Sequence, residues 1–212
     1  MNGKFVTLEG CEGVGKSTQL ENLKEYLFRR GIDAVFTREP GGTRISECIR
    51  SIILCRDYAE MDPMTELMLY MAARRQHTQE FIRKKLEEGR LVICDRYADS
   101  SVAYQGCARG LGTELVKQLN ALAMGGVKID LTLFLDYPPE KAFRRKGGRD
   151  AGDRLENEKI DFHNRVYSGF VKIAEEEPER FMRIDASGEK EQTHAEIVKT
   201  LIGKGIIPPE NN

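Results

Sequence analysis

The sequence predicts an α/β fold: a five-stranded parallel sheet flanked by helices. Short apolar runs alternate with longer helical patterns along the chain, and several of these runs are nearly all apolar. Such strands are typical of parallel sheets that helices cover on both faces. The alternation of strands and helices also favours right-handed crossovers between parallel strands.

The apolar runs predict strands over residues 5–8, 34–37, 91–94, 131–135 and 181–184. The longer patterns predict helices over residues 16–29, 44–54, 64–88, 113–124, 138–146, 155–177 and 189–203. Ligands of such sheets bind beyond the carboxyl ends of the strands. Three strand ends carry glycine, proline or charge and are therefore expected to face one crevice: residues 9–18, 37–43 and 95–97.

Length and composition restrict the possible functions. The 212 residues suit one domain, spanning residues 1–212. With 33 basic and 34 acidic residues, the chain has no general attraction to nucleic acid or to an anionic membrane. No apolar run approaches a membrane span, and the N-terminus has no signal-peptide pattern. The five cysteines contain no C-x-x-C, which favours free thiols in a reducing cytoplasm.

The first strand end carries a phosphate-binding loop. Residues 10–17 read G-C-E-G-V-G-K-S and satisfy the pattern G-x-x-x-x-G-K-[ST]. Glycines let successive N–H groups turn toward phosphate oxygens, and a helix that begins near Lys16 adds its positive end. Lys16 can reach the β- and γ-phosphates, and the Ser17 hydroxyl can ligate Mg²⁺. The residues predicted to hold the donor nucleotide are Gly10, Cys11, Glu12, Gly13, Val14, Gly15, Lys16, Ser17 and Thr18.

Among proteins with such a loop, a small kinase fits best. A GTPase would carry D-x-x-G after a strand, but Asp95 is followed by Arg-Tyr-Ala, and no N-K-x-D occurs. A motor or transporter ATPase would usually need a longer chain. A kinase that transfers phosphate to another phosphate needs positive charge and alignment rather than a general base.

The other strand ends and the third helix supply further candidates. Arg38 can grip a phosphate in bidentate fashion, or it can be a surface arginine. Asp95 can hold Mg²⁺ and Arg96 can bridge two phosphates, or the two can form an internal pair. Tyr70 and Arg74 share a helix face, where they can bind a ligand or be a core aromatic beside a solvated arginine.

Longer stretches form a more specific pattern. They include T-R-E-P-G-G-T (37–43), E-L-M-L-Y-M-A-A-R-R-Q-H (66–77), D-R-Y-A-D-S-S-V-A-Y-Q-G (95–106) and G-D-R-L-E (152–156). In this order, and together with the phosphate loop, they resemble the bacterial form of the thymidylate (dTMP) kinases over nearly the whole chain. The resemblance implies a P-loop NTPase of the nucleoside monophosphate kinase fold with a mobile lid. It also implies a cytoplasmic homodimer that uses ATP and Mg²⁺ to convert dTMP to dTDP for dTTP synthesis.

The resemblance also assigns residues to dTMP: Glu12, Arg38, Tyr70, Arg74, Arg96, Ser101, Tyr104 and Gln105. It places Tyr70 against thymine, where the family commonly has Phe, and Ser101 and Gln105 at the thymine edge. It places Tyr104 near the sugar and Glu12 at the sugar 3′-hydroxyl or at metal-bound water. The expected metal ligands are Ser17 and Asp95, and the expected catalytic residues are Lys16, Arg96 and Arg149.

Residues 144–154 are expected to form the lid. They read R-R-K-G-G-R-D-A-G-D-R, and their glycines make a packed helix improbable. A basic, glycine-rich loop suits closure over ATP, although many charge runs are simply solvated loops. Some thymidylate kinases carry an arginine within the phosphate loop, where this chain has Glu12-Gly13. It therefore resembles the type whose catalytic arginine comes from the lid, here Arg149, with Arg145 expected to pack against adenine.

Two alternatives remain open. The first is a kinase for dUMP, UMP, dCMP or a deoxynucleoside, since one methyl group distinguishes dTMP from dUMP by only ~1–3 kcal/mol. Phosphorylation of a nucleoside would need a base, for which Glu39 is the one strand-end candidate, but Pro40-Gly41-Gly42 favours a monophosphate acceptor. The second is a regulator that binds nucleotides without turnover, which the set Lys16, Ser17, Asp95, Arg96 and Arg149 argues against.

Overall fold

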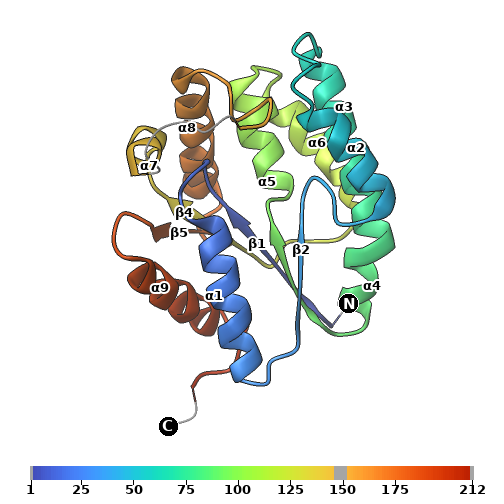
Figure 1. The fold of residues 1–212 in the computed structure, drawn as a ribbon. Coiled ribbons are helices and arrows are strands. Elements are labelled where there is room, and N and C mark those ends of the chain that lie inside the picture. Colours follow the sequence, from blue (N-terminus) through green and yellow to red (C-terminus); the bar gives the residue numbers. More distant parts are fainter. Residues whose placement is uncertain (1, 146–151, 211–212) are drawn as a thin grey trace.

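A five-stranded parallel sheet forms the centre of the computed structural model, which describes residues 2–145 and 152–210 (Figure 1). The strand order is β2-β3-β1-β4-β5, and all four neighbouring pairs are parallel. The strands are β1 (Lys4–Glu9), β2 (Ala34–Arg38), β3 (Leu91–Asp95), β4 (Leu131–Asp136) and β5 (Phe181–Asp185). The predicted fold class and all five strand positions are confirmed.

The helices that surround the sheet are α1 (Lys16–Arg29), α2 (Arg44–Leu54), α3 (Pro63–His77), η1 (Thr78–Ile82), α4 (Arg83–Glu87), α5 (Ala98–Ser101), η2 (Val102–Ala108), α6 (Thr113–Met124), α7 (Pro139–Arg145), α8 (Ile160–Glu176) and α9 (Lys190–Gly203). The long helix predicted over 64–88 runs as α3, the π-helical η1 and α4. The expected helix start at residue 155 is wrong, because residues 154–157 form turns and α8 begins at Ile160. None of these helices is both long and apolar enough to cross a membrane.

Helices cover both faces of the sheet. Phe5 in β1 packs with Ile82 of η1, whereas the next residue, Val6, belongs to the cluster that holds Leu23 of α1. Successive side chains of a strand point to opposite faces, so the two clusters lie on the two sides of β1. Because both faces are covered, the strands need no polar side, which accounts for their apolar composition.

The strand order brings the three informative strand ends together. Leu8 of β1 pairs with Asp95 of β3, and Arg38 of β2 pairs with the same Asp95. The connection that follows β1 leads to β2, at one edge of the sheet. The connection that follows β3 leads to β4, in the opposite direction, so the two connections diverge at the carboxyl ends of β1 and β3. Such a point of divergence is where open α/β sheets bind ligands.

Candidate active site

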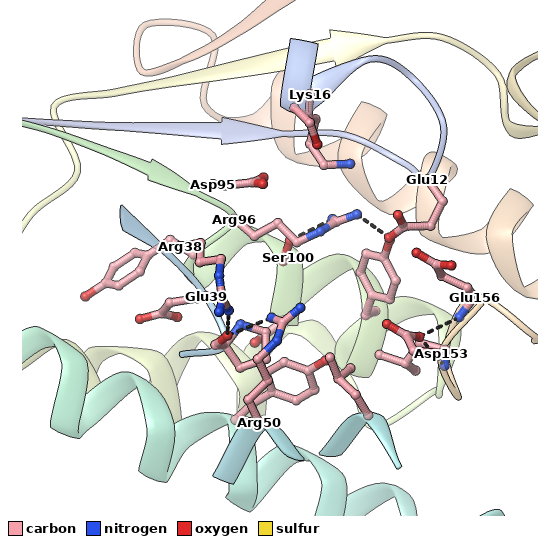
Figure 2. Close-up of a pocket in the computed structure, with 18 of the residues that line it drawn as sticks. Glu12, Lys16, Arg38, Glu39, Arg50, Asp95, Arg96, Ser100, Asp153 and Glu156 are labelled. Atoms are coloured by element: carbon pink, nitrogen blue, oxygen red, sulfur yellow. Dashed lines mark hydrogen bonds and ion pairs between the residues drawn. The ribbon is translucent and has the colours of Figure 1, made fainter. Parts of the chain in front are cut away.

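A cleft of about 470 Å³ lies at the carboxyl ends of β1, β2 and β3 (Figure 2). It is lined by the phosphate loop, the loop after β2, parts of α2 and α3, the turn after β3 with α5 and η2, and residues 153–156. Most of the site residues predicted from the sequence line it: Glu12, Gly13, Gly15, Lys16, Ser17, Thr18, Arg38, Tyr70, Arg74, Asp95, Arg96, Ser101, Tyr104 and Gln105.

Five predicted residues are not among those that line the cleft. Cys11 and Val14 are buried in the core, so only their backbone groups can serve a ligand. Gly10 lies close to the Leu135 carbonyl beneath the loop. Arg145 lies at the end of α7, where its guanidinium stacks on Tyr137 at 4.3 Å and donates to the Ala186 carbonyl. Arg149 lies outside the described residues.

The phosphate loop owes its shape to glycine. Gly10, Gly13 and Gly15 all have positive φ, a conformation that side chains disfavour, and Gly15 immediately precedes α1. Lys16 is buried, and its ammonium donates to the carbonyls of Gly10 (3.1 Å) and Cys11 (2.7 Å). Burial, followed by repulsion from Arg96, lowers the pKa of Lys16. The loop thus positions one cation at the N-terminus of α1, where the first backbone N–H groups of a helix have no partner within it.

Arg96 occupies the middle of the cleft. Figure 2 shows it with Lys16 on one side and Arg38 and Arg50 on the other. Its guanidinium forms an ion pair with Glu12 and lies 5.2 Å from the ring centre of Tyr104. From this position a guanidinium can form charge-assisted hydrogen bonds to anionic groups on either side of it.

Glu12 is ionised because of these neighbours. Burial by itself would raise the pKa of the carboxyl, but attraction to Arg96 and Lys16 and a hydrogen bond from Tyr104 Oη outweigh it. The pKa falls from 4.5 to about 2. Glu12 therefore carries full negative charge at neutral pH and can accept a hydrogen bond from a ligand hydroxyl.

Ser17 and Asp95 fit the magnesium ion that the resemblance leads us to expect. Both line the cleft, and Asp95 Oδ1 is buried with no hydrogen-bond partner among the described residues. In residues 2–145 and 152–210, no group of three or more His, Cys, Asp or Glu side chains is arranged to hold a metal ion. Mg²⁺ in nucleotide sites is usually held by one or two protein oxygens together with phosphates and water, which this pair of oxygens matches.

Arg74 is buried and held by four partners. It donates from Nε to Glu39 (2.8 Å), from Nη1 to Ser101 (3.0 Å) and Asn120 (2.6 Å), and from Nη2 to the Tyr97 carbonyl (2.9 Å). It is only 1% exposed, so its interpretation as a solvated arginine is wrong. A guanidinium fixed in this way can present its edge to a ligand without losing side-chain entropy on binding.

Arg38 is positioned by the glycines that follow it. Glu47 accepts a hydrogen bond from Arg38 Nη2 (3.0 Å) and another from the Gly42 amide (2.8 Å). A Cβ atom at Gly41 would lie 2.6 Å from Arg38 Nη1, and Gly41 has a φ of +126°. The two glycines of E-P-G-G therefore allow the loop to fold closely around this arginine.

Arg50 was not recognised in the sequence. It lines the cleft and donates to the Pro40 carbonyl at 2.7 Å. Ser46 and Ile53 are the buried residues of α2. Arg50 lies four positions after Ser46 and three before Ile53, so it belongs to the same face of the helix. In the sequence, Arg50 could have been recognised as a site residue because it is a charged residue on the buried face of an amphipathic helix.

The C-terminal end of the predicted lid, at Arg154, is attached firmly to the core. Arg154 donates to the Ile53 carbonyl at 3.0 Å and pairs with the buried Glu66. Arg109 donates to both oxygens of the same carboxylate. Asp153 and Glu156 line the cleft on the Glu12 side in Figure 2. No role was predicted for these two carboxylates from the sequence.

The comparisons with known proteins agree on one family. Residues 8–197 match the family described as Thymidylate kinase. The thymidylate kinase of Desulfosudis oleivorans is 48% identical over 204 residues, which cover 93% of this chain and 95% of the relative. That of Geobacillus thermodenitrificans is 46% identical over 207 residues, covering 96% and 92%. A crystal structure of thymidylate kinase from Ehrlichia chaffeensis superposes with a TM-score of 0.78 at 33% identity, covering 95% of this chain and 100% of that chain.

The Glu12–Arg96 pair predicts a pH-dependent contribution to stability. Because the folded pKa of Glu12 is depressed, its contribution is complete above the unfolded value of 4.5 and is lost as the pH falls toward 2. The full contribution corresponds to at most about 3 kcal/mol. Urea unfolding followed by circular dichroism is expected to show Glu12→Gln less stable than wild type at pH 7, with the difference reduced to about half at pH 3.5. A difference that does not change with pH would contradict this contribution.

Proposed function

This chain belongs to the thymidylate kinase family, and we propose how its cleft transfers the γ-phosphoryl group of ATP to dTMP to form dTDP. The observation that carries the mechanism is the position of Arg96 between Lys16 and the pair Arg38 and Arg50. The transfer must bring two anionic nucleotides together, so it requires cations on both sides and one at the junction.

ATP is the donor on the Lys16 side of the cleft. The backbone of residues 10–18 binds its phosphates, and Lys16 contacts the β- and γ-phosphates as they pass the start of α1. Arg145 lies outside the cleft beside Tyr137 and the Ala186 carbonyl, a position suited to adenine packing. When Mg²⁺ is bound by Ser17 and Asp95, it neutralises phosphate charge and aligns the phosphate oxygens.

The phosphate of dTMP lies on the opposite side, between Arg96 and the arginines of β2 and α2. Arg38 and Arg50 both line that side, and both also contact the Pro40 carbonyl. Two guanidinium groups held by one loop can grip several phosphate oxygens together. They hold the attacking oxygen in line with the donor, which is the main task of an enzyme for this reaction.

The base of dTMP lies over α3 and η2. Tyr70 presents its ring, and the polar groups beside it are those of Arg74, Ser101 and Gln105. Tyr104 lies nearer to Glu12, whose carboxylate is placed to accept from the sugar 3′-hydroxyl. Burial raises the pKa of Tyr70 above its usual range, so its hydroxyl stays neutral and can donate.

Glu39 is not available as a base for a nucleoside acceptor. Its Oε2 accepts from Arg74 at 2.8 Å, and its Oε1 lies 3.1 Å from His77 Nδ1. Although Glu39 lines the cleft, it is only 4% exposed and each of its oxygens already has a partner. A monophosphate acceptor needs no base, because its attacking oxygen is already ionised.

A coupled assay of ADP release separates the candidate functions. Turnover is expected with dTMP, slower turnover with dUMP, and none above background with dGMP or thymidine. The single methyl group limits the discrimination between dTMP and dUMP to roughly 10–200-fold. Turnover with thymidine but not dTMP would overturn the assignment, and no turnover with any acceptor would favour a nucleotide-binding regulator.

The lid arginines are expected to have different kinetic roles. Arg149 supplies charge to the transition state in this proposal, so Arg149→Ala lowers kcat by ~10³-fold with nearly unchanged KM for dTMP. Arg145→Ala is the matched control from the same basic segment and raises KM for ATP with a smaller effect on kcat. Steady-state kinetics with each substrate varied in turn measures both. An unchanged kcat for Arg149→Ala would remove this residue from the mechanism.

We also propose that the enzyme is a homodimer. The layer of α2, α3 and α6 lies on one side of the molecule, and α3 packs against both of the others (Figure 1). This layer exposes large apolar side chains: Ile45, Ile52, Met68, Leu115 and Leu122. Arg75, two turns after Met68 on α3, donates to the Leu122 carbonyl of α6, so these two helices lie side by side at this point. An exposed apolar surface of this kind is typical of an interface between subunits.

The cysteines support a cytoplasmic location. All five are free thiols, and Cys11 and Cys94 are buried. Burial raises the pKa of both thiols, so they are unreactive and serve as small apolar residues. Unpaired thiols are usual in proteins of a reducing compartment.

A charge on the proposed interface is expected to separate the subunits. Leu122→Glu places a carboxylate on the layer, and sedimentation velocity is expected to show a monomer at concentrations where wild type is a dimer. Phe28→Glu is the matched control, because Phe28 is 83% exposed on α1, away from this layer, and the variant remains a dimer. A monomeric wild type, or equal dimerisation of both variants, would contradict the proposed interface.

A further inference from the structure

Glu9 is a buried carboxylate to which the mechanism so far assigns no role. It is the last residue of β1, its side chain is fully buried, and it is not among the residues that line the cleft. Its oxygens accept three hydrogen bonds from the segment after β3. The Tyr97 amide donates to Oε1 at 2.8 Å, the Ser100 amide donates to Oε1 at 3.3 Å, and Ser100 Oγ donates to Oε2 at 2.6 Å.

The segment that Glu9 holds contains the strained residue of the site. Arg96 has a φ of 64° and is the single non-glycine residue with positive φ in the described ranges. Such a conformation costs of order 1–3 kcal/mol and persists only where its surroundings impose it. The Arg96 amide donates to the Leu8 carbonyl at 3.0 Å, and the Tyr97 amide donates to Glu9. Leu8 and Glu9 of β1 therefore hold the backbone amides of Arg96 and of the residue that follows it.

Glu9 also completes the start of α5. The residue before this helix, Tyr97, provides no side-chain cap, although the first amides of a helix have no partner within it. Glu9 accepts from two of these amides across the sheet edge. A carboxylate from β1 thus does what a capping side chain normally does, and joins α5 to the strand that carries the phosphate loop.

A side-chain path connects Glu9 to the guanidinium of Arg96. Ser100 Oγ donates to Glu9 Oε2 and accepts from Arg96 Nη1 at 3.2 Å. On its other side the guanidinium pairs with Glu12. Arg96 is therefore held between two carboxylates, one in direct contact and one acting through a serine.

We propose that Glu9 is a positioning residue for phosphoryl transfer, which holds Arg96 at the junction of the two phosphate groups. It acts on the backbone through the Tyr97 and Ser100 amides and on the side chain through Ser100 Oγ. A guanidinium that is already oriented stabilises the transition state without reorganising during the reaction. This inference rests on the bridging role proposed for Arg96.

The ionisation of Glu9 provides a distinctive readout. Burial, followed by repulsion from Asp99, raises the pKa of the carboxyl to about 7, against the opposing effects of Arg96 and the hydrogen bonds. The charged or titratable groups that act on it are Arg96 in the turn, Asp99 on α5 and the Cys94 thiol on β3. When Glu9 is protonated, its hydroxyl donates to Ser100 Oγ and competes with Arg96 for that oxygen. The positioned form is therefore complete only above about pH 7.

The first experiment compares Glu9→Gln with Asp99→Asn at pH 8. Glutamine keeps the shape of Glu9 and still accepts from the amides, but its NH₂ group donates to Ser100 Oγ, as protonated glutamate does. We expect kcat to fall about tenfold while KM for ATP and dTMP changes less than about threefold. Asp99 is the matched control, because it is buried one residue from Ser100 but pairs with Arg180 and contacts neither Arg96 nor the cleft. Asp99→Asn is expected to keep its kcat.

The second experiment follows kcat as a function of pH. The ratio of wild type to Glu9→Gln is expected to fall from about ninefold at pH 8 to about twofold at pH 6, as one group with a pKa of about 7 titrates. The ratio cancels the ionisation of the substrate phosphates, because both enzymes use the same substrates. A ratio independent of pH, or a loss of kcat shared equally by Asp99→Asn, would overturn the proposal in favour of a purely structural role.

The third experiment introduces Glu9→Gln into Arg96→Ala. If Glu9 acts through Arg96, the second substitution is expected to lower kcat less than about twofold further. Equal effects with and without Arg96 would overturn the inference. Full activity of Arg96→Ala itself would instead remove Arg96 from the proposed mechanism. If Glu9→Gln does not fold, Ser100→Ala tests the side-chain path alone. A loss in kcat of about threefold would support this path, and an unchanged kcat would contradict it.

Discussion

Burying several arginines close together is the constraint on which this site depends, because a buried charge is tolerated only beside an opposite one. The chain meets this constraint by pairing three of these arginines with a carboxylate from another element. Arg96 pairs with Glu12 and Arg74 with Glu39 in the cleft, and Arg154 pairs with Glu66 beside it. Each carboxylate also sets the direction of its guanidinium. The cost of ordering these long side chains is therefore met during folding rather than during catalysis.

The same constraint explains an acidic residue within an anion-binding loop. In the proposed mechanism the backbone amides and Lys16 bind the phosphates, whereas the Glu12 side chain turns toward Arg96 and Tyr104. Its charge is balanced by two cations, which lower its pKa to about 2. Glu12 thus restrains the central arginine while the loop remains attractive to phosphate.

Much of the fold and part of the site could be predicted because they depend on local patterns. The five strands were recognisable as apolar runs, and residues 10–17 were recognisable from the spacing of glycine, lysine and serine. No helix bounds were predicted over 98–108, where the chain forms α5 and η2, although the spacing of Ser100, Ser101, Tyr104 and Gln105 suits one helix face. The first amides of this segment are capped by Glu9, a partner that its own sequence does not contain. Arg50 escaped notice because a charged residue in a helix is usually solvated.

The sequence by itself determined the strands of the parallel sheet and the phosphate loop, since each follows from residues that are near one another in the chain. The three strand ends were expected to meet because ligands of such sheets bind at the carboxyl ends of the strands, but it is the strand order that brings them together. Only the tertiary structure decided which carboxylate each arginine takes and how deeply it is buried. Arg74 and Glu39 are separated by 35 residues, and Arg154 and Glu66 by 88. No spacing rule connects positions so far apart, because their contact depends on how the strands and helices pack, and it is this packing that turns separate charged residues into one catalytic cleft.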